Sequence, residues 1–480
     1  MIRTIRLRRF RGFEKAVLPL NRLTVLLGPN SSGKSTFGMA LVALREIQES
    51  RTGEPALAPE PGRSWPVELG RYEDVLHDRK ERIDRTDEPD DVEVAVELGS
   101  GWVEMGFGGR GLYRGGSATR DLLLTRLGLP GPEVTQTTAP PSGISAEQIE
   151  VVQTTGAPLE PGGPIVHRAN VFERQNAEVW RTGSGDEVHL FFRGLVTMGA
   201  RMASSRSDVL VETQAQLDLA NVLAKLTYLR ANRLTPERRW PDAEPSGVGA
   251  AGEWTPQFLF HQRSRPVASG VATIPPTSIA EAEKLVGSGN GWMRAEQTAL
   301  LDGVSSWCAH LQIADGVTSA AETGGIVLRA KVPGQSRARD LTDVGFGVSQ
   351  VLPVLVAGLV APPDSLLVFD QPESQLHPRS QAALADFLCM LVKTGRSVLV
   401  ETHSEALFHR LRLRAAMDEE VARATSVYFL DAPQDCCREP RSVSLAPDAA
   451  LEWPDGFLAE GMQEELAIRA VLATNPGAGR

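Results

Sequence analysis

The segment GPNSSGKS, residues 28–35, constrains the fold of this chain more than any other stretch. It fits the pattern G-x-x-x-x-G-K-S, it follows the aliphatic run 23–27, and from Lys34 onward apolar residues recur at helical spacing. A strand, a glycine-rich loop and a helix in this order cradle phosphate groups, because the loop N–H groups and the helix start point at phosphate oxygens. The sequence therefore predicts a nucleotide site.

This pattern also assigns roles to single residues, with ATP and Mg²⁺ as the expected ligands. Lys34 is predicted to reach the terminal phosphates, and Ser35 is predicted to hold Mg²⁺. The expected contacts to the nucleotide come from Asn30, Ser31, Ser32, Gly33, Lys34, Ser35 and Thr36.

Two further apolar runs, LLVFD (366–370) and VLVETHSE (398–405), end in polar residues and predict parallel strands. In a parallel sheet such strand ends lie on the ligand side. Asp370 suits Mg²⁺, directly or through water, and His403 is predicted to approach the γ-phosphate. A lone histidine is more often a structural or surface residue, which is the alternative for His403.

A second glycine-rich turn opens an apolar helix in LTDVGFGVSQVLPVLVAGL, residues 341–359. Gly345 and Gly347 precede Ser349 and Gln350, and a helix start of this kind attracts anions. Two anion-seeking elements in one chain require either two ligands or two chains. The alternative is an ordinary capped core helix.

The residue after Asp370 raises the question of hydrolysis. Most ATPases of this pattern have a glutamate there that activates water, whereas this chain has Gln371, whose amide cannot accept a proton. Loss of a general base slows a reaction by about 10²–10⁴-fold, and an amide still orients water. Glu373 is a candidate for the missing base; the alternative is a structural role in an ion pair or as a cap of the helix after Pro378.

The remaining patterns predict an α/β fold with a parallel core sheet and an antiparallel β subdomain. Residues 91–98 and 101–107 read as a hairpin, and helices are expected at about 208–230, 293–311 and 378–395. The Pro- and Gly-rich stretch of about 130–164 indicates exposed loops.

Composition restricts the function classes. The chain has 480 residues, 42% of them hydrophobic, and a net charge of −10, which argues against diffuse binding to nucleic acid. No apolar run reaches the length of a membrane span, and the N-terminal stretch lacks a signal-peptide pattern, so a cytoplasmic protein without membrane contact is expected. The cysteines show no metal-ligand spacing and are expected to be reduced: Cys308, Cys389, Cys436 and Cys437.

Two basic clusters leave local nucleic-acid or acidic-partner binding open. One is the stretch from Arg3 to Lys15, and the other comprises Arg230, Arg233, Arg238 and Arg239. The alternative is a solvated face with intramolecular salt bridges.

Taken together, GPNSSGKST, GFGVSQ, DQPESQLHP and ETHS resemble the ABC-type ATPases of the RecF and OLD (overcoming lysogenisation defect) kind, a class often labelled AAA. The stretches LGRYEDVLH (69–77), YLRANRLTPERRWP (228–241) and EWPDGFLAEG (452–461) resemble a bacterial subgroup with a short uncharacterised C-terminal domain. The resemblance covers about two thirds of the chain and is weakest in 110–205.

This resemblance implies a homodimer, or a higher homo-oligomer, in which two chains sandwich two ATP molecules. Gly347, Ser349 and Gln350 would then serve the partner's nucleotide. Asp370 would be the Mg²⁺-associated carboxylate and His403 the γ-phosphate switch, while Gln371 departs from the usual glutamate. The expected domains are 1–110 (N-terminal half of the ATPase head), 111–205 (loop-rich insertion), 206–320 (helical region), 321–435 (C-terminal half of the head) and 436–480 (short C-terminal domain).

The expected function is that of a slow regulatory ATPase in a DNA-linked process such as anti-phage defence or DNA repair. No acidic nuclease cluster is apparent in the sequence, so a separate effector protein is expected to act on any DNA. The alternative function is a non-hydrolysing, ATP-dependent scaffold that binds only protein partners.

Overall fold

The computed structural model describes residues 1–49, 92–108, 214–233, 235–267, 298–431 and 440–445, and the backbone of further strands between 123 and 209. The chain divides into two compact units. The first contains 1–20, 35–226 and 435–439, and the second contains 21–34, 227–434 and 440–480.

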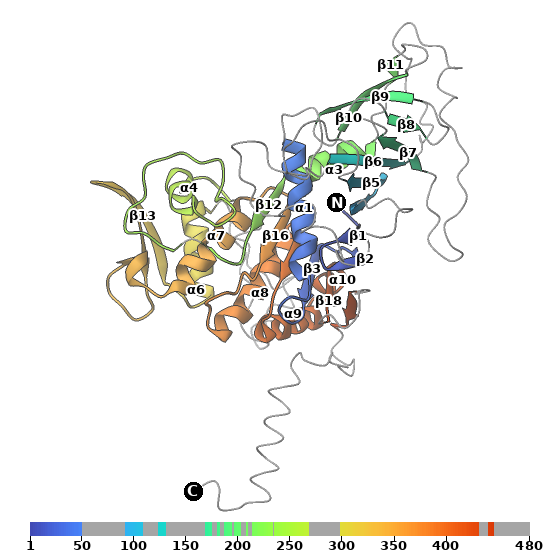
Figure 1. The fold of residues 1–480 in the computed structure, drawn as a ribbon. Coiled ribbons are helices and arrows are strands. Elements are labelled where there is room, and N and C mark those ends of the chain that lie inside the picture. Colours follow the sequence, from blue (N-terminus) through green and yellow to red (C-terminus); the bar gives the residue numbers. More distant parts are fainter. Residues whose placement is uncertain are drawn as a thin grey trace, which may run out of the picture. The chain divides into compact units, whose positions relative to one another are not determined.

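The first unit is built on a ten-stranded antiparallel sheet with the order β11-β10-β9-β8-β7-β6-β5-β4-β1-β2 (Figure 1). In β1, Ile5 and Leu7 are buried, whereas Arg6 and Arg8 alternate with them, as in a strand with one buried face. The strands are β1 (Thr4–Phe10), β2 (Phe13–Pro19), β4 (Val92–Leu98), β5 (Gly101–Gly108), β6 (Leu123–Pro130), β7 (Ala169–Arg174), β8 (Trp180–Thr182), β9 (Glu187–Arg193), β10 (Val196–Met202) and β11 (Asp208–Val209).

The predicted hairpin is confirmed as β4 and β5, which pair through the turn at residues 99 and 100. The stretch predicted as a loop-rich insertion, 111–205, contributes β6 to β10 to this sheet. Glycines and charged residues interrupt these strands, so the alternation that marks a strand in sequence is weak there. The predicted domain bounds stay a prediction.

Two helices belong largely to the first unit, α1 (Lys34–Glu49) and α3 (Gln214–Ala224). Phe37 of α1 packs against Phe13 of β2, with ring centroids 5.2 Å apart. The helix predicted for about 208–230 is thus shorter than expected, because β-branched and aromatic residues after α3 form strand β12 (Leu226–Leu229).

The second unit contains the predicted parallel core sheet, with the strand order β12-β16-β17-β3-β18-β19. Strands β16 (Leu366–Asp370), β17 (Ser397–Glu401), β3 (Leu23–Leu27) and β18 (Thr425–Phe429) are parallel neighbours, and β19 (Arg441–Val443) is antiparallel to β18. All five residues of β3 and of β16 are buried, as expected for central strands of a parallel sheet. The predicted α/β fold is confirmed.

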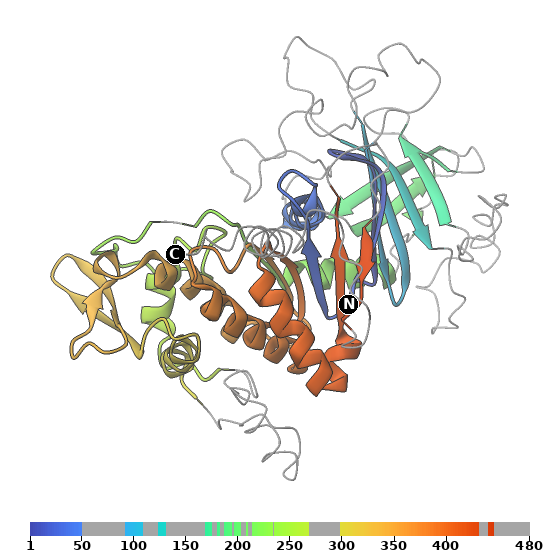
Figure 2. The ribbon, with the colours of Figure 1, turned by 90° about the horizontal axis from the view of Figure 1, so that it is seen from below.

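Helices line this sheet. Helix α8 contacts β3 and β17, and α9 packs along α8. In Figure 2 these orange helices form a row beside the strands. The helix predicted for 378–395 is confirmed as α8; it begins with Pro378 after the cap His377. The helices are α7 (Phe346–Val360), α8 (Pro378–Lys393), α9 (Glu405–Met417) and α10 (Glu419–Ala424).

A smaller antiparallel sheet of three strands lies beyond α6 and α7 in the same unit: β13 (Gly316–Glu322), β14 (Gly325–Lys331) and β15 (Arg339–Asp340). The short helix η4 (Leu341–Asp343) follows it, and α4 (Thr255–Gln262) packs against β13 and β14. Helix α6 (Leu300–His310) corresponds to the helix predicted for about 293–311, and its buried face includes Val304, Trp307 and Cys308. Residues 293–297 of that prediction lie outside the described residues.

Candidate functional site

The loop after β3 has the backbone that a phosphate cradle requires. Gly28 has φ +143°, and a Cβ at this position would collide with the carbonyl oxygen of Leu430, so only glycine fits. Lys34 closes the loop: its Nζ donates hydrogen bonds to the carbonyl oxygens of Gly28 (3.0 Å) and Pro29 (2.6 Å). Burial lowers the pKa of Lys34, and the charge of Glu401 partly opposes this effect. The described loop therefore places a buried ammonium group among backbone polar groups.

The predicted phosphate-binding residues fall on both sides of a unit boundary. Residues 21–34 belong to the second unit, whereas Ser35 and Thr36 begin the next segment of the first unit. Ser32 is buried, and Asn30 and Ser31 are exposed. The role of Ser35 toward Mg²⁺ stays a prediction.

Two carboxylates end neighbouring strands beside this loop. Asp370 of β16 is in register with Glu401 of β17, and the Glu401 carboxylate lies 4.0 Å from Nζ of Lys34. Asp370 accepts a 2.7 Å hydrogen bond from the hydroxyl of Tyr228. Burial raises the pKa of Asp370 to about 7, and the charge of Glu401 adds to the rise. The structure therefore brings the ends of β16 and β17 together beside Lys34, as predicted for two parallel strands.

The turn after β16 is held from two sides. Gln371 has φ +43°, a left-handed backbone that is uncommon for a residue other than glycine. Its N–H donates to the carbonyl of Glu401 (2.8 Å), and Nη2 of Arg233 donates to the carbonyl oxygens of Asp370 (3.1 Å) and Gln371 (3.4 Å). The chain therefore turns sharply directly after the strand.

This turn brings Glu373 back into the protein, where its side chain is buried. One carboxylate oxygen, Oε1, accepts a 3.0 Å hydrogen bond from the N–H of His403, and Oε2 has no partner at hydrogen-bonding geometry in the described part of the chain. Burial raises the pKa of Glu373, and polar groups that include the Thr402 side chain and the His403 N–H offset part of the rise. Glu373 is thus directed to the strand-end edge, where the positive charge of Arg233 also acts on it. The alternative role as a cap of α8 is taken by His377, whose side chain accepts from the N–H of Arg379.

His403 lies half-buried between the end of β17 and the cap of α9, which Ser404 provides. Its Nε2 is buried and has no hydrogen-bond partner within the described ranges. Burial lowers the pKa of His403, and the charge of Lys34 contributes to the decrease. The structure therefore brings His403 into the same electrostatic neighbourhood as Lys34 and Glu373.

Helix α7 carries the second predicted anion element. Residues 351–359 of α7 are all buried, as in a core helix, but Gly345 and Phe346 at its start are exposed. Gln350 is buried, and the hydroxyl of Ser349 donates to the carbonyl of Phe346 (2.8 Å). That Gly347, Ser349 and Gln350 contact a partner's nucleotide stays a prediction.

Gly347 is required for close packing. A Cβ at this position would lie only 2.9 Å from the carbonyl oxygen of Gln375, in the segment that follows Glu373. The first turn of α7 therefore touches the segment that links β16 to α8.

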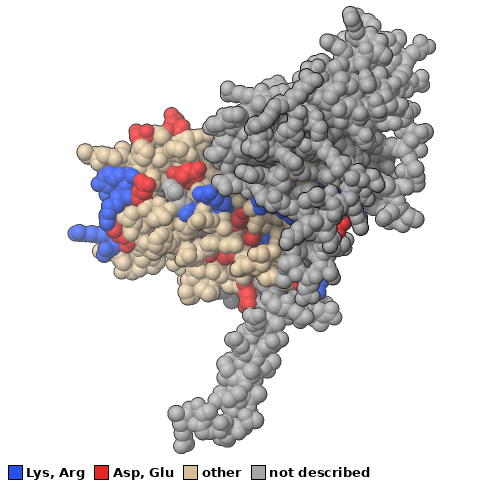
Figure 3. Space-filling view, in the orientation of Figure 1, with Lys and Arg blue, Asp and Glu red and all other residues tan. Residues whose placement is uncertain are grey.

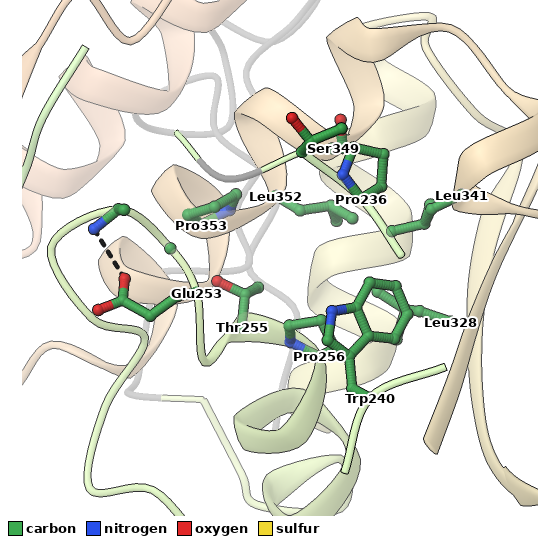
Figure 4. Close-up of a pocket in the computed structure, with 13 residues that line it drawn as sticks. Pro236, Trp240, Glu253, Thr255, Pro256, Leu328, Leu341, Ser349, Leu352 and Pro353 are labelled. Carbon is green, nitrogen blue, oxygen red and sulfur yellow. Dashed lines mark hydrogen bonds between the residues drawn. The ribbon is translucent and has the colours of Figure 1, made fainter. Parts of the chain in front are cut away.

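Ser349 also borders an apolar groove beside α7 (Figure 4). Figure 4 shows Ser349, Leu352 and Pro353 of α7 on one side, with Trp240 and with Pro256 of α4 across from them. The hydrogen bond drawn there joins the carboxylate of Glu253 to the N–H of Ala251, at 2.8 Å.

Three residues of the site were not singled out as site residues in the sequence: Tyr228, Arg233 and Glu401. Tyr228 and Arg233 lie more than a hundred positions before Asp370, so spacing gives no signal for them. Glu401 stands next to Thr402 and His403 at a predicted strand end, and that position could have indicated it.

Among the described members of the basic clusters, several are engaged within the chain. Arg8 pairs with Glu93, Arg238 with Asp343 and Arg239 with Glu322, and Arg233 is buried. Figure 3 shows basic and acidic side chains next to each other on the described face. These contacts favour the alternative of intramolecular salt bridges.

The donor chemistry at the strand ends fits the predicted ligands. Carboxylate oxygens such as those of Asp370 are the groups that Mg²⁺ prefers, and Lys34 supplies the charge that phosphate needs. Among the described residues no cluster of three or more His, Cys, Asp or Glu could hold a metal by itself. An ion at Asp370 would therefore need further oxygen ligands, as Mg²⁺ does when it binds with phosphates and water.

Residues 271–408 match the family model described as "AAA domain, putative AbiEii toxin, Type IV TA system". The matched segment contains Asp370, Glu373 and His403, and together with the phosphate-binding loop it supports a P-loop ATPase domain. No curated protein matches the chain. The stretches 69–77 and 452–461, on which the predicted subgroup and C-terminal domain rest, lie outside the described residues.

Solved structures similar to the chain include heads of SMC proteins. An SMC head bound to the C-winged helix domain of ScpA has 14% identity and a TM-score of 0.40, and covers 96% of this chain and 99% of its own. The SMC head from Thermotoga maritima has 10% identity and a TM-score of 0.32, and covers 92% and 99%. TM-scores this low do not establish a common fold, so the fold assignment rests on the strand order above. Among the described helices, none is long and apolar enough to cross a membrane.

Proposed function

We propose that this protein is a slow ATPase whose ATP-bound homodimer acts as a regulatory switch for a separate effector protein. The process is DNA-linked, either anti-phage defence or DNA repair. The matched family model carries a toxin–antitoxin description, which supports an effector-linked role in defence. The single observation that supports the proposed ATP hydrolysis is the position of Glu373.

Glu373 has the properties of a general base. It is buried, its Oε1 is held by the N–H of His403, and its Oε2 is unpaired within the described residues. A base works best when its pKa is close to the operating pH, and burial moves the pKa of Glu373 in that direction. Glu373 would accept a proton from the attacking water while the amide of Gln371 orients that water.

The other residues act on the phosphates. Lys34 and the loop N–H groups would bind the terminal phosphates, and His403 would contact the γ-phosphate with Nε2. Mg²⁺, held by Asp370 and by the predicted ligand Ser35, would neutralise charge on the phosphate oxygens. Because phosphoryl transfer depends mainly on positioning and charge, this site hydrolyses ATP although Gln371 replaces the usual glutamate.

The second candidate function is an ATP-dependent scaffold without hydrolysis. The observation that favours it is the amide at Gln371, in the position where a glutamate usually activates water. The two functions differ in the effect they predict for a substitution of Glu373: the slow ATPase loses turnover, whereas the scaffold has no turnover to lose.

The deciding experiment compares ATP turnover of the wild type and of Glu373→Gln, with and without DNA. If Glu373 is the base, kcat falls by about one to four decades while ATP affinity is retained. Glu405→Gln, which changes an exposed glutamate at the start of α9, is the matched control and should leave turnover unchanged. Equal turnover of Glu373→Gln and wild type would refute the base assignment, and no turnover in any form would support the scaffold.

A further inference from the structure

Arg233 is a buried cation whose donors are only partly used. Its side chain is 5% exposed, and it lies beyond the sheet's edge strand β12, on the segment that leads toward α4. Only Nη2 donates to protein carbonyls, whereas Nε and Nη1 have no partner among the described residues. A buried donor without a hydrogen-bond partner destabilises a fold, so this arrangement calls for an explanation.

Strand β12 and the residues that follow it contact the end of β16 twice. Tyr228 donates to the carboxylate of Asp370, and Arg233 donates to the backbone carbonyls of Asp370 and Gln371. Gln371 has a left-handed backbone, and Glu373 follows two residues later. The contacts of Arg233 therefore fix the turn that sets the direction of the Glu373 side chain.

Arg233 also acts through its charge. Burial lowers the pKa of Arg233 to about 10, so the group stays protonated at neutral pH. The charges that stabilise its protonated form are, in order of strength, those of Glu373 and Asp370. By the same interaction Arg233 stabilises the ionised carboxylate of Glu373.

A purely structural arginine in this chain looks different. Arg396 is fully buried, and all three of its nitrogens donate to carbonyl oxygens, Nε and Nη2 to Ala361 and Nη1 to Thr394. No carboxylate contributes to the lowered pKa of Arg396, which burial alone explains. Arg396 precedes β17 and lies at the opposite end of the parallel strands from Glu401, so it serves as a matched control for burial of an arginine.

We propose that Arg233 is a positioning residue for the general base: it holds the Gln371 turn through two carbonyls and places its positive charge beside Glu373. This inference rests on the proposed function, in which Glu373 is the base. It requires no contact between Arg233 and the nucleotide.

The test measures kcat against pH at saturating ATP and Mg²⁺ for Arg233→Met, Arg233→Lys and Arg396→Met. Removing a positive charge beside a carboxylate raises its pKa, so the acid limb of Arg233→Met should move to higher pH. Its kcat at the plateau should fall by about 10²-fold because the turn is no longer held. Arg233→Lys should keep the acid limb near its wild-type position but lose turnover, because a lysine does not bridge the carbonyls as a guanidinium does.

Two controls separate the outcomes. Arg396→Met should lower the unfolding temperature without moving the acid limb, and ATP affinity should be retained in Arg233→Met. The carboxyl signal of Glu373 in isotope-labelled protein, assigned by its loss in Glu373→Gln, reports the same pKa change without turnover. An unmoved carboxyl titration in Arg233→Met, or loss of its ATP binding, would overturn the role of Arg233. Full turnover in Glu373→Gln would instead overturn the proposed base.

Discussion

Asp370 should make the folded protein less stable as it ionises. Its pKa rises from 3.8 to about 7 on folding, first because of burial and second because of Glu401. The protonated form is therefore the one that the fold favours: this stabilisation is complete below pH 3.8 and is lost as the pH rises through about 7. A difference of about three pKa units corresponds to about 4 kcal/mol.

Asp370→Asn removes this titration, because an amide mimics the protonated carboxyl and its oxygen can still accept from Tyr228. Relative to wild type, the variant should gain stability as the pH rises, by roughly 2.5 kcal/mol between about pH 5 and pH 8, while it loses Mg²⁺-dependent ATP hydrolysis. Urea unfolding of both proteins across this pH range measures the difference. Asp364→Asn removes an exposed carboxylate and controls for net charge. A stability difference that does not change with pH would refute the reasoning.

Three further variants test the nucleotide site. Lys34→Ala should cut ATP affinity severely and leave the fold intact, because Lys34 hydrogen-bonds its own loop and not the core. ATP binding and circular dichroism measure the two effects, and unchanged ATP binding would contradict the assignment of Lys34. Ser349→Arg should block ATP-dependent association but spare nucleotide binding by each chain, as read by cross-linking across the predicted interface; wild-type cross-linking in the variant would argue against the ATP sandwich. Gln371→Glu should raise turnover and shorten the life of the ATP-bound dimer, since it restores a carboxylate at the usual position; a rate at or below wild type would show that this position does not limit hydrolysis.

The parts of the site that follow from local patterns could be predicted from the sequence. The loop before Lys34 and the strands that end at Asp370 and Glu401 are continuous segments, and the periodicity of their apolar residues gives their type. Parallel pairing then places their ends at one edge, which is why Lys34, Asp370 and His403 could be expected to lie close together.

The partners of these residues could not be predicted in the same way. Tyr228 and Arg233 reach Asp370 only because β12 is the neighbour of β16 in the sheet, and strand order is not visible in a single sequence. Likewise, the left-handed backbone of Gln371 is imposed by tertiary contacts, since glutamine has no preference for it. The roles of the exposed start of α7 depend on a second chain and stay predictions for the same reason.

The contact between Gly347 and the carbonyl of Gln375 has a consequence for how two nucleotides would influence each other. In an ATP-joined dimer, Gly347 would face the partner's ATP while Gln375 belongs to the turn that follows the chain's own Glu373. No side chain separates Gly347 from this turn. If the partner's ATP lost its γ-phosphate and α7 shifted slightly, α7 would therefore push on the turn that carries Glu373 of its own chain. The two sites of such a dimer would then be coupled through this contact and would not act independently.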